Sequence, residues 1–174
     1  MKLMQTIHSY DVSLFTWVMR RKTQKFQVFC AKGISKTGDG YCYLVLGLAL
    51  LWSQGVDELR LLSCMALGLL MERPLYFILK NACKRDRPPV ALNINSFIVP
   101  SDRFSFPSGH TSAAFLMAIL LGWFLPAWLP LLLAWAVLVG MSRVILGVHF
   151  PTDTAVGALM GACTALLSLG LVVA

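Results

Sequence analysis

The sequence predicts an all-α integral membrane protein, a bundle of about five transmembrane helices preceded by amphipathic helices at the membrane surface. Two observations predict this class. Of the 174 residues, 57% are hydrophobic and 13% are charged, whereas soluble domains average about 45–50% apolar and about 25% charged residues. The apolar residues also form runs close to the roughly 20 residues that cross the hydrocarbon core as a helix. Together these features are typical of a membrane protein.

Five apolar segments account for the predicted bundle. They run from residue 41 to 56, 59 to 79, 111 to 125, 128 to 148 and 153 to 174. Residues 11–30 instead mix large apolar side chains with Arg20, Arg21, Lys22 and Lys25, a pattern typical of helices that lie on a membrane surface. We therefore expect an N-terminal surface segment, residues 1–37, and a transmembrane domain, residues 38–174.

The cysteines and the net charge narrow the class of partner. The five cysteines show no C-x-x-C spacing and lie in or beside apolar runs, so they indicate small buried side chains instead of a metal site or disulfides. The formal net charge is +7, but the cations form no single basic stripe, which favours lipid phosphate over nucleic acid. The sequence specifies no oligomeric state.

The order of the segments predicts that most polar residues of chemical interest share one membrane face. The second helix ends where the polar stretch 81–107 begins, and the third begins where that stretch ends. The third and fourth are joined by a turn at Pro126, and the fourth and fifth meet at 147–152. Up-and-down threading therefore brings 80–88, 107–110, 142–149 and Asp153 together.

The first polar segment is KNACKRDRP, residues 80–88. If the helix continues, residues seven apart differ by only about 20° around its axis, so Lys80 and Arg87 project to the same side. Pro88 then turns the chain out of the helix. The alternative is that these cations only reach lipid headgroups, and for Lys84 and Arg85 we expect that role alone.

The second polar segment is FPSGHTS, residues 106–112, at the start of an apolar helix. Free backbone N–H groups at the positive end of a helix dipole bind anions, and His110 projects from the first turn toward such a site. The alternative is ordinary helix capping by the side chain of Ser108.

The third polar segment is SRVILGVHFPTD, residues 142–153. An unpaired guanidinium such as that of Arg143 is costly within an apolar span and normally marks a functional site. His149 precedes a helix whose first turn holds Asp153. A carboxylate that binds one imidazole nitrogen leaves the other as a nucleophile or base; the alternative is a histidine that only forms headgroup-level hydrogen bonds. Glu72 and Arg73 lie in mid-span beside Pro74. Contact with substrate and pairing with neighbouring helices are the two alternatives for them, since adjacent residues do not face each other on a helix.

These three segments resemble the motifs of the type 2 phosphatidic acid phosphatases, which share an active site with the vanadium haloperoxidases. The family pattern is a lysine followed after six intervening residues by Arg-Pro, then Pro-Ser-Gly-His, then Ser-Arg. The Ser-Arg is followed after five residues by His and after three more by Asp. The matching residues are Lys80 with Arg87-Pro88, Pro107 to His110, and Ser142-Arg143 with His149 and Asp153. Three motifs in this order are a specific signal, and the resemblance covers about residue 41 to the C-terminus.

The resemblance implies a role for each matched residue. His149 attacks phosphorus, Asp153 orients His149, and His110 protonates the leaving oxygen and later activates water. The phosphate is held by five residues: Lys80, Arg87, Ser108, Gly109 and Arg143. No metal and no cofactor are implied, and the sequence has no cluster of spare carboxylates to ligate magnesium.

The expected function is therefore hydrolysis of a membrane lipid phosphate monoester or diphosphate through a phosphohistidine. Undecaprenyl diphosphate, phosphatidate and phosphatidylglycerol phosphate are the candidate substrates. A lipid phosphotransferase is the closest alternative, and a catalytically inactive lipid-binding or transport protein is another. A haloperoxidase is disfavoured because soluble members lack such a bundle.

The expected location is the bacterial inner membrane. The resemblance favours an active site on the outer face, whereas six basic residues between Arg20 and Lys36 favour the cytoplasm by the positive-inside rule.

Overall fold

The computed structural model describes residues 2–20, 24–53, 55–100 and 102–173, and confirms the all-α class. A single isolated bridge joins Asp86 and Phe104. The elements are α1 Lys2–Met19, α2 Gln24–Thr37, α3 Gly40–Ser53, α4 Val56–Cys83, α5 Pro88–Ala91, α6 Gly109–Phe124, the 3-10 helix η1 Pro126–Trp128, α7 Leu129–Ile145 and α8 Pro151–Val172.

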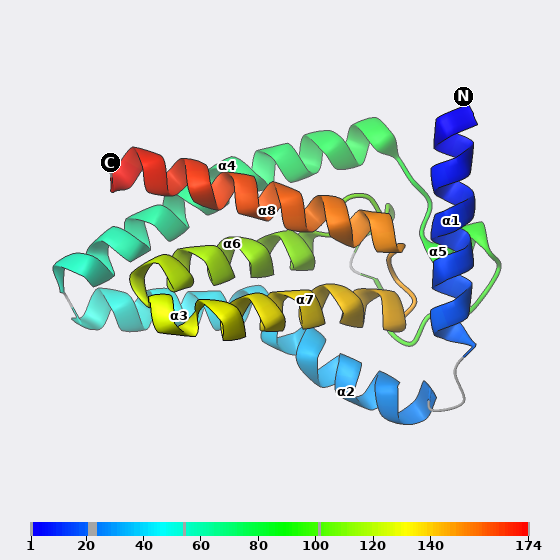
Figure 1. Cartoon of the computed structure of the whole chain (residues 1–174), viewed down its shortest axis with the longest axis horizontal. Helices are drawn as coiled ribbons and strands as arrows, with labels where there is room; N and C mark the ends of the chain where they lie inside the picture. The colour runs from blue at the N-terminus through cyan, green and yellow to red at the C-terminus, as the bar shows by residue number, and fades with distance from the viewer. Residues whose placement is uncertain (1, 21–23, 54, 101, 174) are drawn as a thin grey trace.

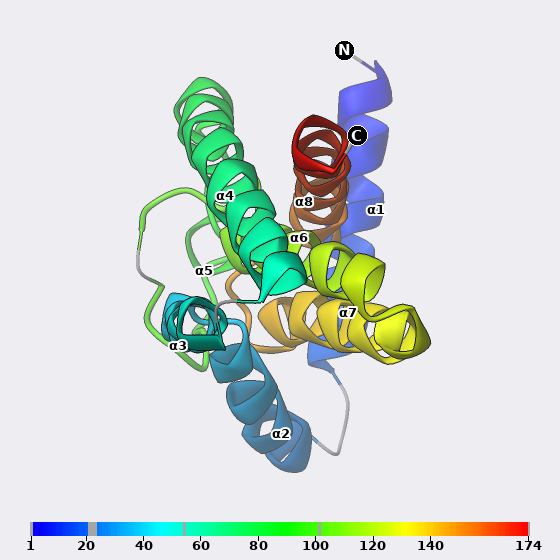
Figure 2. The same cartoon turned by 90° about the vertical axis from the view of Figure 1, so that its left-hand side faces the viewer.

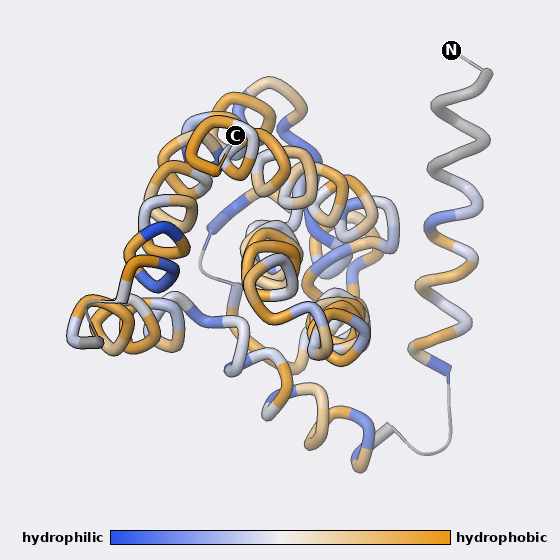
Figure 3. The backbone as a smooth tube through the Cα atoms, turned by 60° about the vertical axis from the view of Figure 1, so that its left-hand side comes forward, coloured by the Kyte–Doolittle hydropathy of each residue, from blue (hydrophilic) through white to orange (hydrophobic). Residues whose placement is uncertain are grey.

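The central helix of the bundle is α6. Figures 1 and 2 show α4, α8, α7 and the shorter α3 arranged around it. The largest core cluster joins α4, α6 and α8 through eight buried residues: Leu61, Cys64, Met65, Leu116, Met117, Leu120, Ala165 and Leu169. Outside this core, bulky apolar side chains such as Leu70 and Leu166 are 70% and 60% exposed. Apolar side chains on both the inside and the outside are what a helical bundle needs in lipid. Figure 3 shows the same preponderance of hydrophobic residues along these helices.

Within the described residues, three helices have the length and composition to cross a membrane by themselves. They are α4, the continuous η1–α7 segment Pro126–Ile145, and α8, whereas α6 is a shorter apolar helix. The five predicted apolar segments all form helices, but α6 has 16 residues and α3 has 14, or about 24 and 21 Å. Because its neighbours surround α6, it packs against protein and does not have to match the roughly 30 Å of hydrocarbon.

The N-terminal segment forms two helices that contact the bundle at one end. Figure 1 shows α1 lying across the end of α7 and α8, while α2 packs beside α7. Phe15 of α1 is 1% exposed, and its ring centroid lies 5.5 Å from that of Phe150. Trp17, Phe26 and Phe29 remain exposed on these helices. The division of the chain at residue 37 and the placement of residues 1–37 at the membrane surface stay predictions.

Two glycines allow α8 to approach α6 closely. A Cβ atom added to Gly157 would lie 2.5 Å from the Ser108 carbonyl oxygen, and one added to Gly161 would lie 2.0 Å from that of Ser112. Small residues at such crossings let helix backbones pack together in membranes. The approach brings the start of α6 against the start of α8, where the Ser108 N–H donates to the Asp153 carbonyl at 3.0 Å.

This contact predicts that Gly161→Ala destabilises the bundle. Overpacking of a tight core costs about 1–3 kcal/mol, so the thermal unfolding midpoint in detergent is expected to fall by about 2–10 °C. Gly170→Ala is the matched control in the same helix, because a Cβ there meets nothing within 4 Å. Equal midpoints for the two variants would contradict the packing described above.

Candidate active site

The structure brings all eight predicted site residues to one end of the bundle. They lie at the end of α4 and the loop after it, the start of α6, the end of α7 and the start of α8. A pocket of about 650 Å³ opens among them, and Arg87, Gly109, His110, Arg143 and His149 contribute to its lining. The rest of its wall is largely apolar and comes from α3 and α4, through Leu44, Leu48, Leu51, Leu62, Met65 and Leu69.

His149 lies in the turn between α7 and α8, which begins with Gly147 at a φ of 77°. Its side chain is nearly fully buried. Nδ1 lies 3.7 Å from Oδ2 of Asp153, beyond hydrogen-bond distance, and has no hydrogen-bond partner among the described residues. Nε2 lies on the other side of the ring, 3.3 Å from Nη1 of Arg87. One nitrogen therefore faces the carboxylate and the other faces a cation at the pocket.

The surroundings of His149 keep its imidazole neutral. Burial lowers the pKa of His149 to about 4; the Asp153 carboxylate opposes this shift, and the Arg87 cation adds to it. At neutral pH an imidazole with this pKa is uncharged, and a neutral ring has one nitrogen with a free lone pair. The ring is therefore in the protonation state that a nucleophile requires.

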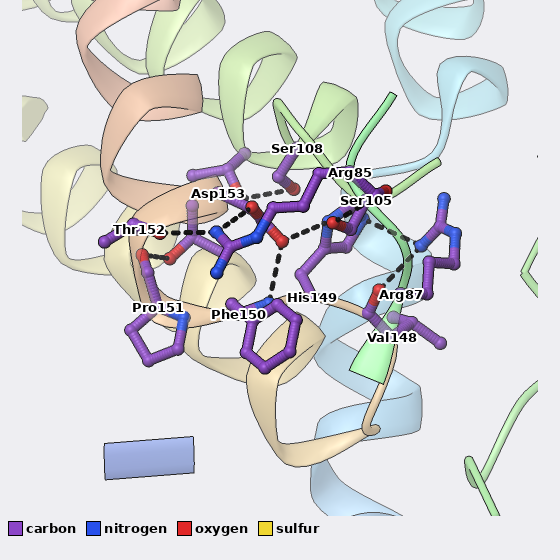
Figure 4. Close-up of polar contacts among 12 residues, drawn as sticks. Arg85, Arg87, Ser105, Ser108, Val148, His149, Phe150, Pro151, Thr152 and Asp153 are labelled. Atoms are coloured by element: carbon purple, nitrogen blue, oxygen red, sulfur yellow. Dashed lines mark hydrogen bonds and ion pairs between the residues drawn. The ribbon is translucent and has the colours of Figure 1, made fainter. Parts of the chain in front are cut away.

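Asp153 is held by contacts at both ends of the residue (Figure 4). Its Oδ2 accepts a hydrogen bond from the Phe150 N–H at 2.8 Å, and its Oδ1 binds Nη1 of Arg85 at 2.8 Å. Its backbone carbonyl accepts the Ser108 N–H. The carboxylate beside His149 therefore has a defined position, set by α8, the loop after α4 and the start of α6.

Arg85 is part of this network, so the interpretation of Arg85 as only a headgroup-level cation is wrong. Its Nη2 binds Oδ2 of Asp11 at 2.5 Å, its Nη1 donates to Oγ1 of Thr152 at 2.7 Å, and its guanidinium lies 4.3 Å from the Phe150 ring centroid. Asp11 also accepts a hydrogen bond from the Thr152 N–H at 3.0 Å. Helix α1 is thereby connected to the carboxylate that faces His149.

Lys80 and Arg87 converge on one carboxylate, that of Asp102. Lys80 Nζ lies 2.7 Å from Asp102 Oδ2, and an Arg87 Nη2 ion pair occupies Oδ1. The Tyr76 hydroxyl donates to Oδ2 at 2.8 Å. Burial opposes ionisation of Asp102, but hydrogen bonds from Lys80, Arg87 and Tyr76 outweigh it and lower the pKa of this carboxyl to about 2. Asp102 is therefore charged throughout the physiological pH range.

This convergence does not require a helix that continues from Lys80 to Arg87. Helix α4 ends at Cys83, and Lys84 adopts a left-handed conformation with its N–H bonded to the Lys80 carbonyl. The chain then turns, and Arg87 reaches the Val148 carbonyl with Nη1 at 2.7 Å. Lys80 and Arg87 meet because the 102–105 loop folds back over the end of α4, where the Ser105 N–H donates to the Arg85 carbonyl.

The start of α6 has no side-chain cap, which contradicts the capping alternative for Ser108. No side-chain cap hydrogen bond is formed by Ser108; its Oγ lies instead 2.9 Å from Oγ1 of Thr111. The first N–H groups of a helix lack partners within the helix. In α6 those groups belong to Gly109, His110 and Thr111, beside the pocket.

His110 and Arg143 both contact residues from the N-terminal part of the chain. His110 Nε2 lies 3.0 Å from Oδ1 of Asp39. Arg143 is 5% exposed and donates from Nη1 to Oγ of Ser35 at 2.6 Å. Its Nε is buried without a hydrogen-bond partner in the described part of the chain, and the residue lines the pocket.

Glu72 and Arg73 pair with each other, so the alternative in which they pair with neighbouring helices is wrong. Glu72 is fully buried, and Arg73 forms an ion pair to it through Nε. The Cβ atoms of adjacent residues on a helix point in different directions, but the arginine side chain is long enough to bend back to its neighbour. Arg73 also lines the pocket, as a further cation near the site.

Five polar residues of this site were missed by sequence reasoning: Asp11, Ser35, Asp39, Tyr76 and Asp102. None belongs to a motif, and most of their partners are distant in sequence. One signal was present, because the chain has only eight Asp and Glu residues. In a chain with 15 Lys and Arg residues, each carboxylate near a cationic site is a candidate partner for that site.

The arrangement suits the binding and attack of a tetrahedral oxyanion. Arg87 and Arg143 line one space together with Gly109 and His110 at the start of α6. Lys80 binds the same Asp102 carboxylate as Arg87. Such fixed cations and dipoles stabilise developing negative charge without reorganisation. The Nε2 atom of His149 faces the same space, and His110 lies across the pocket.

A sequence profile and one relative connect this chain to known proteins. The profile of the PAP2 superfamily matches residues 57–174. Decaprenylphosphoryl-5-phosphoribose phosphatase from Mycobacterium tuberculosis is 33% identical over 136 residues, which are 76% of this chain and 73% of that protein.

Two solved structures share the fold. LpxE from Aquifex aeolicus superimposes with a TM-score of 0.78 at 29% identity, covering 91% of this chain and 94% of that one. A PAP2-type phosphatidylglycerolphosphate phosphatase from Bacillus subtilis superimposes with a TM-score of 0.75 at 28% identity, covering 95% and 86%. Both alignments extend beyond residues 57–174, since they cover 91% and 95% of this chain.

The contacts of Asp102 predict that it competes with anions for Lys80 and Arg87. Asp102→Asn is expected to bind inorganic phosphate about tenfold more tightly than the wild-type chain, a difference of about 1.4 kcal/mol, because the cations lose a competing carboxylate. The measurement is isothermal titration of the detergent-solubilised protein with phosphate.

Asp86→Asn is the control for this prediction, because it removes one exposed carboxylate from the same end of the bundle and leaves the Lys80 and Arg87 contacts in place. Its phosphate affinity is expected to match that of the wild type. If Asp102→Asn also binds phosphate no more tightly than the wild type, Asp102 is not a competitor.

Proposed function

Because the chain belongs to the PAP2 superfamily, we propose that it hydrolyses a membrane lipid phosphate monoester or diphosphate through a phosphohistidine on His149. The observation that carries this proposal is the buried, neutral imidazole of His149. Its Nε2 faces the Arg87 side of the pocket while Nδ1 faces a carboxylate. An imidazole in this state has both the lone pair and the orientation for attack on phosphorus.

The proposed first step exchanges one bond to phosphorus for another. Nε2 of His149 forms the N–P bond as the P–O bond to the lipid breaks, and His110 gives a proton to the leaving lipid oxygen. Lys80, Arg87 and Arg143, with the N–H groups near Ser108 and Gly109, bind the phosphoryl oxygens. Asp153 stabilises the positive charge that develops on the His149 ring.

The proposed second step returns the enzyme to its starting state. A water molecule gives a proton to His110 and forms a P–O bond as the N–P bond breaks. The products are inorganic phosphate and free His149, and His110 is again protonated for the next cycle. In two-step hydrolysis, one residue commonly acts as the acid in the first step and as the base in the second.

The shape of the pocket supports a lipid as the substrate. From the catalytic end, its wall continues along α3 and α4 through leucine and methionine side chains, among them Leu48, Leu51 and Met65. An apolar wall next to a cationic end suits a long hydrocarbon chain that carries a phosphate group. We propose the polyprenyl diphosphate, phosphatidate and phosphatidylglycerol phosphate classes. The relatives named above act on a decaprenylphosphoryl sugar phosphate and on phosphatidylglycerolphosphate.

We also propose that hydrolysis needs no divalent metal. The carboxylates nearest the pocket already have partners: Asp102 binds Lys80 and Arg87, Asp153 binds Arg85, and Asp39 contacts His110. Their negative charge is therefore balanced by protein groups, and Lys80, Arg87 and Arg143 supply the positive charge that a metal supplies in other phosphoryl-transfer sites.

A panel of lipid phosphates tests this function directly. Purified protein in detergent with a metal chelator is expected to release phosphate from at least one of the three classes, and His149→Ala is expected to lose at least about 10³-fold in kcat. The acid-labile phosphohistidine is expected to be trapped on His149 by rapid denaturation at alkaline pH.

Four outcomes would overturn the proposal. Phosphate release that survives His149→Ala excludes the phosphohistidine, and strict dependence on added metal excludes the metal-free mechanism. Transfer of phosphate to a lipid acceptor with little release to water would make the chain a phosphotransferase. Lipid binding without turnover would make it an inactive lipid-binding protein.

We propose that the protein resides in the bacterial inner membrane with this end of the bundle on the outer face. The resemblance of the motifs supports this orientation. Arg20, Lys25, Lys32 and Lys36 of the N-terminal segment lie near the same end and favour the cytoplasm instead, so direct labelling decides between the two.

The orientation test uses two cysteine variants of a chain whose five native cysteines are replaced by alanine. Val99→Cys lies in the loop before α6 at the catalytic end, where Val99 is 93% exposed, and Trp128→Cys lies at the opposite end, where Trp128 is 57% exposed. A membrane-impermeant maleimide is expected to label residue 99 in intact spheroplasts and residue 128 only after permeabilisation. The reverse pattern would place the catalytic end in the cytoplasm.

A further inference from the structure

Three side chains that precede residue 57, where the family match begins, reach the catalytic end of the bundle. Asp11 of α1 binds Arg85 and Thr152, Ser35 of α2 binds Arg143, and Asp39 between α2 and α3 contacts His110. Each therefore contacts a different part of the site. Of the three, Asp39 contacts a residue to which the proposed reaction assigns a proton.

The structure holds Asp39 in a defined place above the pocket. Gly38 lets the end of α2 approach α7, because a Cβ there would lie 2.9 Å from Cγ1 of Val139. Trp135 Nε1 donates to Oγ1 of Thr37 at 2.8 Å, and Arg143 donates to Ser35. The Asp39 N–H in turn bonds to the Lys36 carbonyl at 3.1 Å. The residues on either side of Asp39 are thus attached to α7.

From this position the carboxylate reaches the imidazole of His110. Oδ1 of Asp39 lies 3.0 Å from Nε2, with the two side chains 41% and 30% exposed. The other charged or titratable side chains that line the same pocket come from α3, α4, the loops and α7: Tyr43, Arg73, Tyr76, Arg87, Asp102, Arg143 and His149.

The charges around His110 are therefore mostly positive. Arg73, Arg87 and Arg143 disfavour a protonated imidazole, since like charges repel, whereas a carboxylate at hydrogen-bond distance favours it. Asp102 is a carboxylate in the lining of the pocket, but it is bound by Lys80 and Arg87. Asp39 is thus the carboxylate placed to stabilise a proton on His110.

We propose that Asp39 is a positioning residue for His110, orienting its ring and stabilising the protonated imidazole that gives a proton to the leaving lipid oxygen. This inference rests on the proposed function. A protonated imidazole has two N–H donors, of which Nε2 contacts Asp39 and Nδ1 is the one left for the leaving oxygen. The connection between α2 and α3 then has a role in catalysis.

The first test compares the kinetics of the wild-type chain with those of two Asp39 variants. All are full-length proteins in detergent, and dispersed phosphatidate is the substrate. Asp39→Asn is expected to lower kcat about 10–100-fold and to change KM by less than about threefold. The pH at which kcat falls on the alkaline side is expected to move down by about one unit, because the protonated imidazole loses its carboxylate. Asp39→Glu is expected to recover most of kcat and the wild-type profile.

Asp86→Asn is the matched control, because it removes an exposed carboxylate from the same end of the bundle without altering the His110 contact. It is expected to keep the wild-type kcat and pH profile. Two results would overturn the role of Asp39: an unchanged kcat and profile in Asp39→Asn, or an equal loss in Asp39→Asn and Asp39→Glu with no movement of the alkaline limb. The latter result indicates a purely structural contribution.

A second measurement does not depend on turnover. The titration midpoint of the His110 ring, followed by NMR of the ¹⁵N-labelled protein in detergent, is expected to be about one pH unit lower in Asp39→Asn than in the wild type. An unchanged midpoint would overturn the inference. Activity that survives His149→Ala, or wild-type protein that hydrolyses no lipid phosphate, would instead count against the proposed function and leave the NMR comparison to decide on Asp39.

Discussion

The position of Asp153 is the constraint on which the rest of the site depends. Its carboxylate faces His149 and is bound by Arg85 and the Phe150 N–H, while its backbone carbonyl accepts the Ser108 N–H. This residue at the start of α8 therefore connects the start of α6, the loop after α4 and, through Arg85 and Asp11, helix α1. The close packing of Gly157 and Gly161 against α6 makes these contacts possible.

Balanced charge is the second feature of this end of the bundle. Of the eight Asp and Glu residues, Asp11, Asp39, Asp102 and Asp153 all contact cations or histidines of the site. Removing one partner from a buried charge pair is costly because it leaves the other charge uncompensated. Lys80 and Arg87 share one such carboxylate, that of Asp102.

The two histidines of the site have different surroundings, and this matches the different tasks proposed for them. His149 is 2% exposed, and this burial keeps its pKa low and its ring neutral. His110 is at the open side of the pocket and lies within hydrogen-bond distance of Asp39. A nucleophile that must stay uncharged and an acid that must hold a proton require this kind of contrast.

The sequence by itself determined the helical membrane class, because apolar composition and segment length depend only on local residues. Motif spacing also identified His110, His149 and Asp153 as neighbours, since up-and-down helices bring alternate ends together. The tertiary structure alone decided the partners of the charged groups: Arg85 with Asp11, Lys80 and Arg87 with Asp102, and His110 with Asp39. Those partners lie on loops and on N-terminal helices, whose positions depend on long-range packing such as Phe15 against Phe150. No periodic pattern in the sequence predicts which distant carboxylate a cation will bind.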